Sequence, residues 1–261
     1  MTEKTNKKSN ERLKIAIVTG ASSGLGKRFA LYSHMFFPDI DEVWLVGRNE
    51  QRLLHTSKFV RSNTRIFALD LTDEDELKGL TDSLKEVNPD IRLLINSAGC
   101  GYMGRFDVIS TEDNIQMVDI NCRALTMLTS ICVNYMHKDS RIINLASAAA
   151  FICQSNFAVY AATKSYVLSL SDALSKELRR KKIYVTAVCP GAVNTPFFDT
   201  ADKYEKMKKF KKLFMSKEKY VVIKALWDSK KKKNRSVYGL HMKMFYLACK
   251  LLPRKLMMMF V

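Results

Sequence analysis

A short apolar run that enters a glycine-rich turn constrains this chain more than any other feature. Ile15-Ala16-Ile17-Val18 leads directly into Thr19-Gly20-Ala21-Ser22-Ser23-Gly24-Leu25-Gly26, and a segment with helical apolar spacing follows. This order indicates a strand, a tight turn and the start of a helix, where glycines let the backbone approach a ligand and free N–H groups favour negative charge. We therefore predict a pyrophosphate site at this turn, with the spacing G-x-x-x-G-x-G rather than G-x-G-x-x-G.

Short apolar segments alternate with helical periodicity along most of the chain. We expect strands at Lys14–Thr19, Val43–Val46, Arg65–Leu69, Leu93–Asn96, Arg141–Leu145 and Ile183–Val188, and the clearest helices at Asp113–His137 and Ala158–Arg180. This order predicts an α/β fold of one domain: a doubly wound, Rossmann-like parallel sheet in three layers. Because ligands of such sheets bind beyond the carboxyl ends of the strands, residues that follow strands are the candidates for a site.

The composition limits the class of protein. The first 14 residues are charged and lack the apolar segment of a secretory signal, and no uncharged apolar run is long enough to span a membrane, so we expect a cytoplasmic protein. The six cysteines form no C-x-x-C pair and are expected to be reduced thiols. The four histidines are scattered, so no metal site is expected.

Tyr160 and Lys164 lie four residues apart in a helical segment and so face the same side. An ammonium group near a phenol lowers the phenol's pKa, and such a tyrosine can give a proton to a carbonyl oxygen or take one from an alcohol. The same pattern occurs elsewhere, where a solvated helix surface is the simpler interpretation, at Tyr204, Tyr220 and Tyr246. Only Tyr160 follows a strand that ends at a serine, Ser147, 13 residues upstream.

Further polar and glycine-containing segments follow the other predicted strands. They are Arg48 after the second strand, Asp70 after the third, Asn96-Ser97-Ala98-Gly99 at the end of the fourth and Cys189–Thr195 after the sixth; Asn121 lies in the long helix. In this order and spacing the chain resembles a short-chain dehydrogenase/reductase of the common type over about residues 12 to 200.

The resemblance implies a role for each matching residue. In the catalytic set, Tyr160 is the proton donor and acceptor, Lys164 lowers its pKa and holds the nicotinamide ribose, Ser147 binds the substrate oxygen, and Asn121 bends its helix around a water that relays protons. In the cofactor set, the pyrophosphate turn is formed by Gly20, Ser23, Gly24, Leu25 and Gly26, and Asp70 and Leu71 flank the adenine. The residues that support the cofactor after the fourth strand are Asn96, Ala98 and Gly99. The residues that hold the nicotinamide are Pro190, Gly191, Val193 and Thr195. Ser97, Ala146 and Ala150 depart from the commoner family residues, and Ala150 is expected to reshape the substrate wall.

The end of the second strand favours NADP(H) over NAD(H). An NAD site needs an acidic side chain there to bind the ribose 2′-hydroxyl group. The sequence at this position is Val46-Gly47-Arg48-Asn49, which contains no carboxylate. Arg48 can pair with a 2′-phosphate, and Ser22 can add a hydroxyl group.

The segment from Pro196 to Ser216 is expected to cover the substrate, with Phe197 and Phe198 in contact with it. The other aromatic residues of this segment are Tyr204, Phe210 and Phe214. An aromatic cover of this kind suits a lipophilic ketone or alcohol, either steroid-like or with a long acyl chain. The lysines from Lys203 to Lys212 could also bind a phosphorylated or carrier-linked substrate, so this alternative stays open.

Positive charge is concentrated in the C-terminal quarter. Residues 203–255 hold 18 basic and three acidic residues, whereas residues 15–202 carry a net charge of −1. We therefore divide the chain into a basic extension (1–12), the Rossmann-like domain (13–240) and a basic amphipathic tail (241–261). In the tail, the apolar residues at helical spacing are Phe245, Tyr246, Cys249, Leu252, Leu256, Met259 and Phe260, with Lys243, Lys250 and Arg254 on the other side and a break at Pro253.

Two explanations of this tail stay open: packing on its own domain or a partner, and peripheral contact with an anionic membrane surface. Nucleic acid is disfavoured because no binding module is recognisable. The sequence thus predicts an NADP(H)-dependent oxidoreductase, and the resemblance implies a homo-oligomer, dimer or tetramer. The alternative is a non-catalytic NADP-binding protein that acts through its basic tail.

Overall fold

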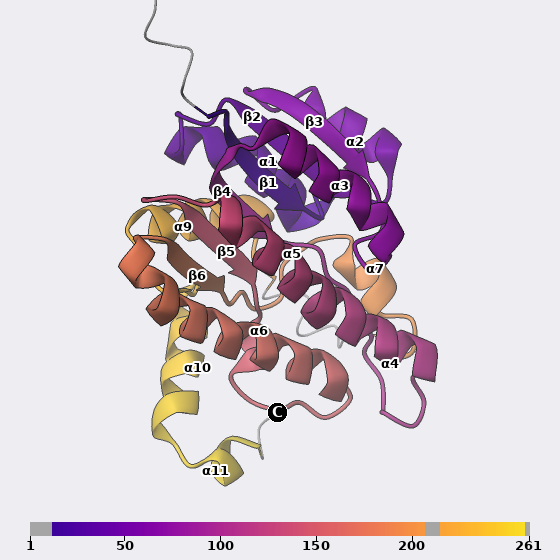
Figure 1. Ribbon diagram of the computed structural model, residues 1–261. Helices are drawn as coiled ribbons and strands as arrows, with labels where there is room; N and C mark the ends of the chain where they lie inside the picture. Colours follow the sequence, from indigo (N-terminus) through magenta and orange to yellow (C-terminus); the bar gives the residue numbers. More distant parts are fainter. Residues whose placement is uncertain (1–11, 207–214, 259–261) are drawn as a thin grey trace, which may run out of the picture.

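The computed structural model describes residues 12–206 and 215–258 (Figure 1). Several sequence expectations concern residues outside these ranges. They are nearly all of the basic extension, the lysines from Lys208 to Lys212 with Phe210 and Phe214, and Met259 and Phe260.

Seven parallel strands form one sheet in the order β3-β2-β1-β4-β5-β6-β7. Their bounds are β1 Lys14–Thr19, β2 Glu42–Gly47, β3 Asn63–Ala68, β4 Asp90–Asn96, β5 Arg141–Leu145, β6 Tyr184–Val188 and β7 Arg235–Ser236. The six predicted strands are confirmed within three residues at either end, and β7 was missed. The order reverses between β1 and β4, which opens a crevice at the carboxyl ends of these two strands, where such folds bind ligands.

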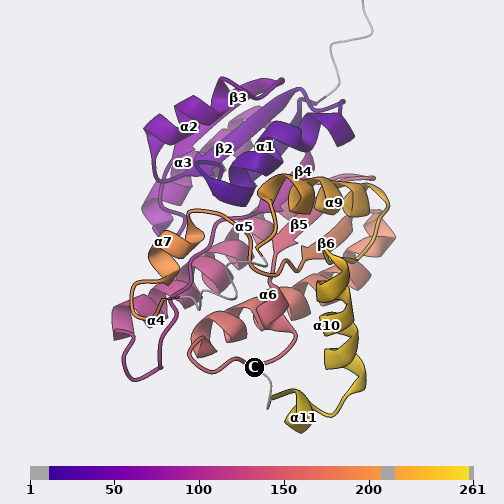
Figure 2. The ribbon, with the colours of Figure 1, turned by 180° about the vertical axis from the view of Figure 1, so that it is seen from behind.

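Helices cover both faces of the sheet, so the predicted three-layer fold is confirmed (Figures 1 and 2). One apolar core joins the sheet to α1 (Gly24–Phe36), α2 (Glu50–Ser57) and α9 (Glu218–Lys230). The other core joins the opposite face to α3 (Glu74–Val87), α5 (Leu125–Cys132) and the end of α6 (Ala158–Glu177). The central strands are buried on both faces, which explains why they read as continuous apolar runs rather than alternating ones.

The long helix predicted at Asp113–His137 is interrupted. It consists of α4 (Thr111–Val118), a π-helical turn (Asp119–Ala124), α5 and a 3₁₀ turn (Val133–Tyr135). The wide π turn carries Asn121, and π turns are frequent at functional sites. The second predicted helix, Ala158–Arg180, is α6 followed by a 3₁₀ turn at Leu178–Lys181, and a further 3₁₀ turn follows β5 at Ala148–Ala150.

The lysine run 230–233 is tied to the domain by contacts with both neighbouring and distant residues. Lys230, Lys231 and Lys232 lie over the rings of Phe37, Trp227 and Tyr184, respectively. Lys233 joins Lys224 and Ser236 around the carboxylate of Asp228, whose side chain is 1% exposed. Part of the basic charge therefore serves to fix α9 against β7.

Helix α7 (Phe197–Ala201) follows β6. Beyond β7 the chain continues as α10 (Leu240–Leu251) and α11 (Arg254–Met258). Both views show α10 and α11 extending from the body of the molecule beside the α6 layer (Figures 1 and 2). None of the helices in the described ranges is long and apolar enough to cross a membrane.

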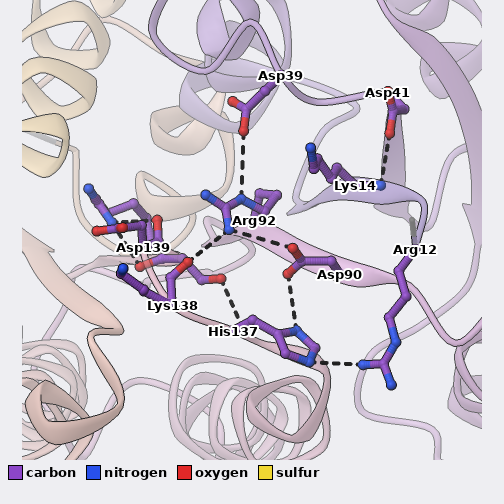
Figure 3. Close-up of polar contacts among 11 residues, drawn as sticks. Arg12, Lys14, Asp39, Asp41, Asp90, Arg92, His137, Lys138 and Asp139 are labelled. Carbon is purple, nitrogen blue, oxygen red and sulfur yellow. Dashed lines mark hydrogen bonds and ion pairs between the residues drawn. The ribbon is translucent and has the colours of Figure 1, made fainter. Parts of the chain in front are cut away.

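A polar network closes the opposite end of the sheet, where β1 and β4 begin (Figure 3). The imidazole of His137 lies between two partners: its Nε2 is 2.8 Å from a guanidinium nitrogen of Arg12, and its Nδ1 is 3.2 Å from a carboxylate oxygen of Asp90. Since a guanidinium can only donate, Nε2 accepts and Nδ1–H donates, which corresponds to the neutral ring. Arg92 extends the network to Asp90 and Asp39.

Candidate active site

The glycine-rich turn provides open backbone groups at the start of α1. Gly20 and Gly24 have φ values of +66° and +50°, which disfavour any residue with a side chain, and a Cβ at Gly26 would lie 2.2 Å from the Gly20 carbonyl oxygen. Ser23 occupies the N-cap of α1, but no side chain caps this helix and its first turn holds no acidic residue. Side chains cap α2, α3 and α4, whereas α6, α9 and α10 lack a side-chain cap as α1 does. The turn therefore fits an anion such as a pyrophosphate.

Thr19 holds this turn against the end of β4, a role that the sequence analysis missed. Its hydroxyl accepts hydrogen bonds from the backbone N–H groups of Ser97 and Ala98, both at 3.0 Å. Gly20 and Ala98 are in close contact, because a Cβ at Gly20 would lie 3.0 Å from the Ala98 nitrogen. Asn96, expected to support the cofactor, instead points into the interior, where its amide donates to Thr129 and Asn144.

The residues expected around the adenosine lie at the ends of β2 and β3. Arg48 is 73% exposed and lies 3.9 Å from the carboxylate of Asp70. Ser22 approaches the same point, since a Cβ at Gly47 would be 3.5 Å from its Oγ. Leu71 is buried in the core beside α3. Arg48 and Ser22 thus both lie beside the carboxyl end of β2.

Tyr160, Ser147 and Lys164 come together beyond the ends of β5 and β6. Tyr160 is 8% exposed, and the Ser147 side chain lies near enough to its phenol to lower the pKa of Tyr160. The Nζ of Lys164 lies 5.6 Å from the centre of the Tyr160 ring and donates to the carbonyl oxygen of Leu145 at 2.8 Å. The helical spacing and the strand end predicted from the sequence therefore produce one compact polar group.

Burial dominates the ionisation of this group. It raises the pKa of Tyr160 to about 12, and the Ser147 side chain opposes that rise. It also lowers the pKa of Lys164 to about 8. The expectation that the Lys164 charge lowers the pKa of Tyr160 is not met in this structure, because burial raises that pKa more than the neighbouring groups lower it.

Asn121 lies beside this group on the π turn. Its amide donates to the Cys100 carbonyl oxygen at 2.8 Å and to the Thr163 hydroxyl at 3.0 Å, while its carbonyl oxygen accepts from the Cys100 N–H. A Cβ at Gly99 would lie 2.7 Å from the Asn121 oxygen and 3.4 Å from the Lys164 Nζ, so all three meet at one point. The helix is distorted at Asn121, as the resemblance implied.

An aromatic cluster covers Tyr160. The sequence analysis predicted Phe197 and Phe198 near the substrate but did not predict Phe157. The Phe157 ring stacks on the Tyr160 ring with centroids 4.2 Å apart, and Phe197 of the cover lies 5.6 Å away on another side. Phe198 contacts Phe197 edge-on. A Cβ at Gly101 would lie 2.6 Å from the Tyr160 ring, so only glycine fits there. Phe157 follows a loop without periodic signal, which is why the sequence analysis missed it.

Charged and aromatic groups hold the cover to α4. The hydroxyl of Tyr204 donates to the Asp113 carboxylate at 2.7 Å, and Lys203 pairs with the same carboxylate oxygen at 2.6 Å. The Lys203 ammonium also lies over the rings of Tyr204 and Tyr102. Tyr204, the tyrosine of the second Tyr-x-x-x-Lys pattern, is therefore a structural contact of the cover.

The loop after β6 lies between the turn and the catalytic group. The Pro190 carbonyl oxygen accepts from Ala148 N–H at 2.8 Å, and the side chain of Thr195 approaches Gly24. Val193 is buried and bridges to Ser216. A Cβ at Gly191 would lie 2.7 Å from the Met242 sulfur, so α10 packs directly on this loop. No cluster of metal-ligating side chains occurs among the residues that the structure describes.

Comparison with known proteins agrees with this geometry. Residues 14–206 match the sequence model of a family described as short chain dehydrogenase. An uncharacterized oxidoreductase of Staphylococcus epidermidis is 32% identical over 197 residues, which make up 75% of this chain and 84% of that protein. A similar protein of Staphylococcus saprophyticus is 31% identical over 195 residues, 72% of this chain and 82% of its own length.

Solved structures resemble nearly the whole chain. A short-chain dehydrogenase from Sphingobium yanoikuyae in complex with NADPH has a TM-score of 0.78 and 27% identity, covering 94% of this chain and 95% of that one. The bulky-bulky ketone specific alcohol dehydrogenase from Comamonas testosteroni has a TM-score of 0.73 and 25% identity, with 93% of each chain covered.

Proposed function

Since the chain belongs to the short-chain dehydrogenase/reductase family and uses a nicotinamide cofactor, we propose that it interconverts a lipophilic ketone and its secondary alcohol with NADP(H). The observation that carries this proposal is the buried group of Tyr160, Ser147 and Lys164 beside the uncapped turn of α1.

Tyr160 transfers the proton in the reaction. In reduction its phenol gives a proton to the carbonyl oxygen, and in oxidation the phenolate takes one from the alcohol. The Ser147 hydroxyl donates a hydrogen bond to the same substrate oxygen and stabilises the charge that develops there. When bound, the nicotinamide supplies or accepts the hydride. Lys164 and Asn121, which meet at Gly99, provide the route by which Tyr160 exchanges its proton.

The preference for NADP(H) rests on the corner formed by Arg48 and Ser22. No carboxylate follows β2 directly; Asp70, from the end of β3, is the acidic group near Arg48, at 3.9 Å. A guanidinium and a hydroxyl at this place favour a 2′-phosphate over a free 2′-hydroxyl. The NADPH bound to the Sphingobium relative, 27% identical, supports the same assignment.

The lipophilic substrate class rests on the cover of Tyr160. Phe157, Phe197 and Tyr102 surround the phenol with apolar rings, and the nearby charge of Lys203 is paired with Asp113. This pairing makes the described part of the cover a poor site for a phosphorylated substrate. A steroid-like or long-chain ketone fits better, in line with the bulky ketones of the Comamonas relative.

Two further expectations stay proposals. The family resemblance supports a homo-oligomer, dimer or tetramer. The reaction itself needs no membrane, and peripheral membrane contact of the C-terminal region is a separate proposal that rests on α10.

The proposal is tested by following NADPH and NADH oxidation with steroid ketones, 3-oxoacyl thioesters, bulky aryl ketones and sugar phosphates. We expect turnover of the apolar ketones, with a higher kcat/KM for NADPH than for NADH. A preference for NADH would contradict the assignment of Arg48, and turnover restricted to sugar phosphates would contradict the substrate class.

A further inference from the structure

Helix α10 presents a row of exposed apolar side chains to solvent. Leu240, Met244, Leu247 and Leu251, here called the outer row, are 74%, 63%, 52% and 70% exposed. Their spacing of four, three and four residues places them on one face of the helix. Single exposed apolar residues are ordinary on protein surfaces, but a continuous row of this kind marks a contact site.

The opposite face of α10 is also apolar and is already occupied. Met242 packs on Gly191, and Phe245 and Tyr246 pack on Phe151. A guanidinium nitrogen of Arg235 also donates to the Tyr246 hydroxyl at 2.6 Å. The two apolar faces therefore have different roles, and the inner one anchors the helix to the domain.

For Phe245 and Tyr246 the structure decides between the two explanations of the tail, because both side chains pack on the domain. The outer row was not among the apolar residues named from the sequence. A helix that is apolar on opposite sides is normally buried on both, so the outer row lacks a cover within the described chain.

The charges beside the outer row are of one sign. Lys243 and Lys250 are exposed and lie together along one edge of the row, and Lys255 is exposed on α11. From residue 239 to residue 261 the sequence contains no Asp or Glu. No ion pair joins these three lysines to an acidic residue in the described ranges of the chain. Further exposed apolar side chains continue the surface: Leu252, Leu256 and Met258.

We propose that α10 and α11 dock on an anionic lipid surface. The outer row enters the boundary between headgroups and acyl chains, and the lysines contact headgroup phosphates. Because the inner face fixes α10 to the domain, the helix binds preformed and carries the domain with it. A symmetric contact between two copies fits less well, since it would bring the lysines of one copy against those of the other. The proposal does not depend on the reaction proposed above.

The test is co-sedimentation of the full-length protein with phosphatidylcholine vesicles, with and without phosphatidylglycerol. We expect binding that requires phosphatidylglycerol and weakens steeply with salt. The variant Lys243→Gln/Lys250→Gln should bind about 30-fold more weakly. The outer-row variant Leu247→Gln/Leu251→Gln should lose binding to a similar or greater extent.

The matched control is Met35→Gln/Phe59→Gln, which removes two residues that are 62% and 60% exposed away from α10. It should bind like the natural protein, and the thermal unfolding of every variant should be unchanged. The proposal is overturned if the natural protein does not bind the anionic vesicles, or if the outer-row variant binds as well as the control. Loss of a dimer in the outer-row variant, without vesicle binding, would assign the row to a second copy instead.

Discussion

The ring of Phe157 stacks on the ring of Tyr160 with centroids 4.2 Å apart and planes inclined by 18°. This contact keeps water from the phenol, and burial is the main reason why the pKa of Tyr160 is raised to about 12. We therefore predict that Phe157 is a positioning residue that acts through Tyr160.

Phe157→Ala should shift the pH dependence of reduction. The substitution exposes the phenol, so the pKa of Tyr160 falls from about 12 toward its ordinary value of 10.0. Because reduction needs the protonated phenol, the decline of kcat/KM at high pH should begin at a lower pH. Phe157→Leu, which keeps an apolar cover, should retain more of the natural profile. Identical profiles for all three proteins would show that Phe157 does not control the phenol.

Lys164→Met should stabilise the protein at neutral pH while it abolishes turnover. The pKa of Lys164 is lowered by burial from 10.5 to about 8, so the unfolded chain binds the proton more tightly. Protonation thus destabilises the folded state, fully below pH 8, and this cost disappears as the pH rises toward 10.5. The gain is on the order of 2 kcal/mol after loss of the hydrogen bond to Leu145.

The measurement for Lys164→Met is the free energy of unfolding by urea, compared with the natural protein between neutral pH and pH 10. The advantage of the variant should shrink as the pH rises. An advantage that grows with pH would contradict the sign of the lowered pKa.

Arg48→Ala should weaken NADPH use specifically. Loss of one charge-assisted contact with a phosphate costs about 1.5–3 kcal/mol, which corresponds to a rise of about 10- to 100-fold in the KM for NADPH. The KM for NADH should change little. Arg52→Ala, an exposed arginine of the adjacent α2, is the control and should leave both values unchanged. Equal loss with both cofactors would place Arg48 outside a 2′-phosphate site.

Asp228→Asn should destabilise the fold by about 3 kcal/mol, because it leaves two lysines without their shared, buried carboxylate. Burial alone would raise the pKa of Asp228, but hydrogen bonds from Lys224, Ser236 and Lys233 lower it below 3.8. The stabilisation is therefore present at neutral pH and is lost as the pH falls through that lowered pKa. Urea unfolding at pH 7 measures it, with the exposed Asp107→Asn as a control that should cost less than about 1 kcal/mol. Equal effects of the two substitutions would refute the role of Asp228.

Much of the fold was predictable because the buried parallel strands leave a strong apolar signal. A strand of two residues, such as Arg235–Ser236, leaves none. The π turn at Asn121 was also invisible to periodicity, since it adds only a fraction of a residue per turn. The lysines at 230–233 find partners as distant as Phe37 and Asp139, which no local pattern could indicate.

The sequence predicted which residues form the candidate site better than it predicted which atoms those residues contact. Ser147, Tyr160 and Lys164 meet because strand ends and helical spacing bring them together. The resemblance implied that Asn96 supports the cofactor, and the sequence could not show that its amide binds Thr129 and Asn144 in the interior. In α10, apolar residues occupy two opposite faces, so spacing alone could not tell which face contacts the domain.

The central claim is that Tyr160 is the proton donor, and it is tested most directly by Tyr160→Phe beside Tyr166→Phe. Tyr166 lies on the same helix but is 42% exposed and contacts Thr126 rather than the site. With the best ketone of the panel, Tyr160→Phe should lower the rate of NADPH oxidation by about 10²- to 10⁴-fold while NADPH binding, followed by its fluorescence, is retained. Tyr166→Phe should react at the natural rate. A Tyr160→Phe variant that turns over as fast as Tyr166→Phe would contradict the account.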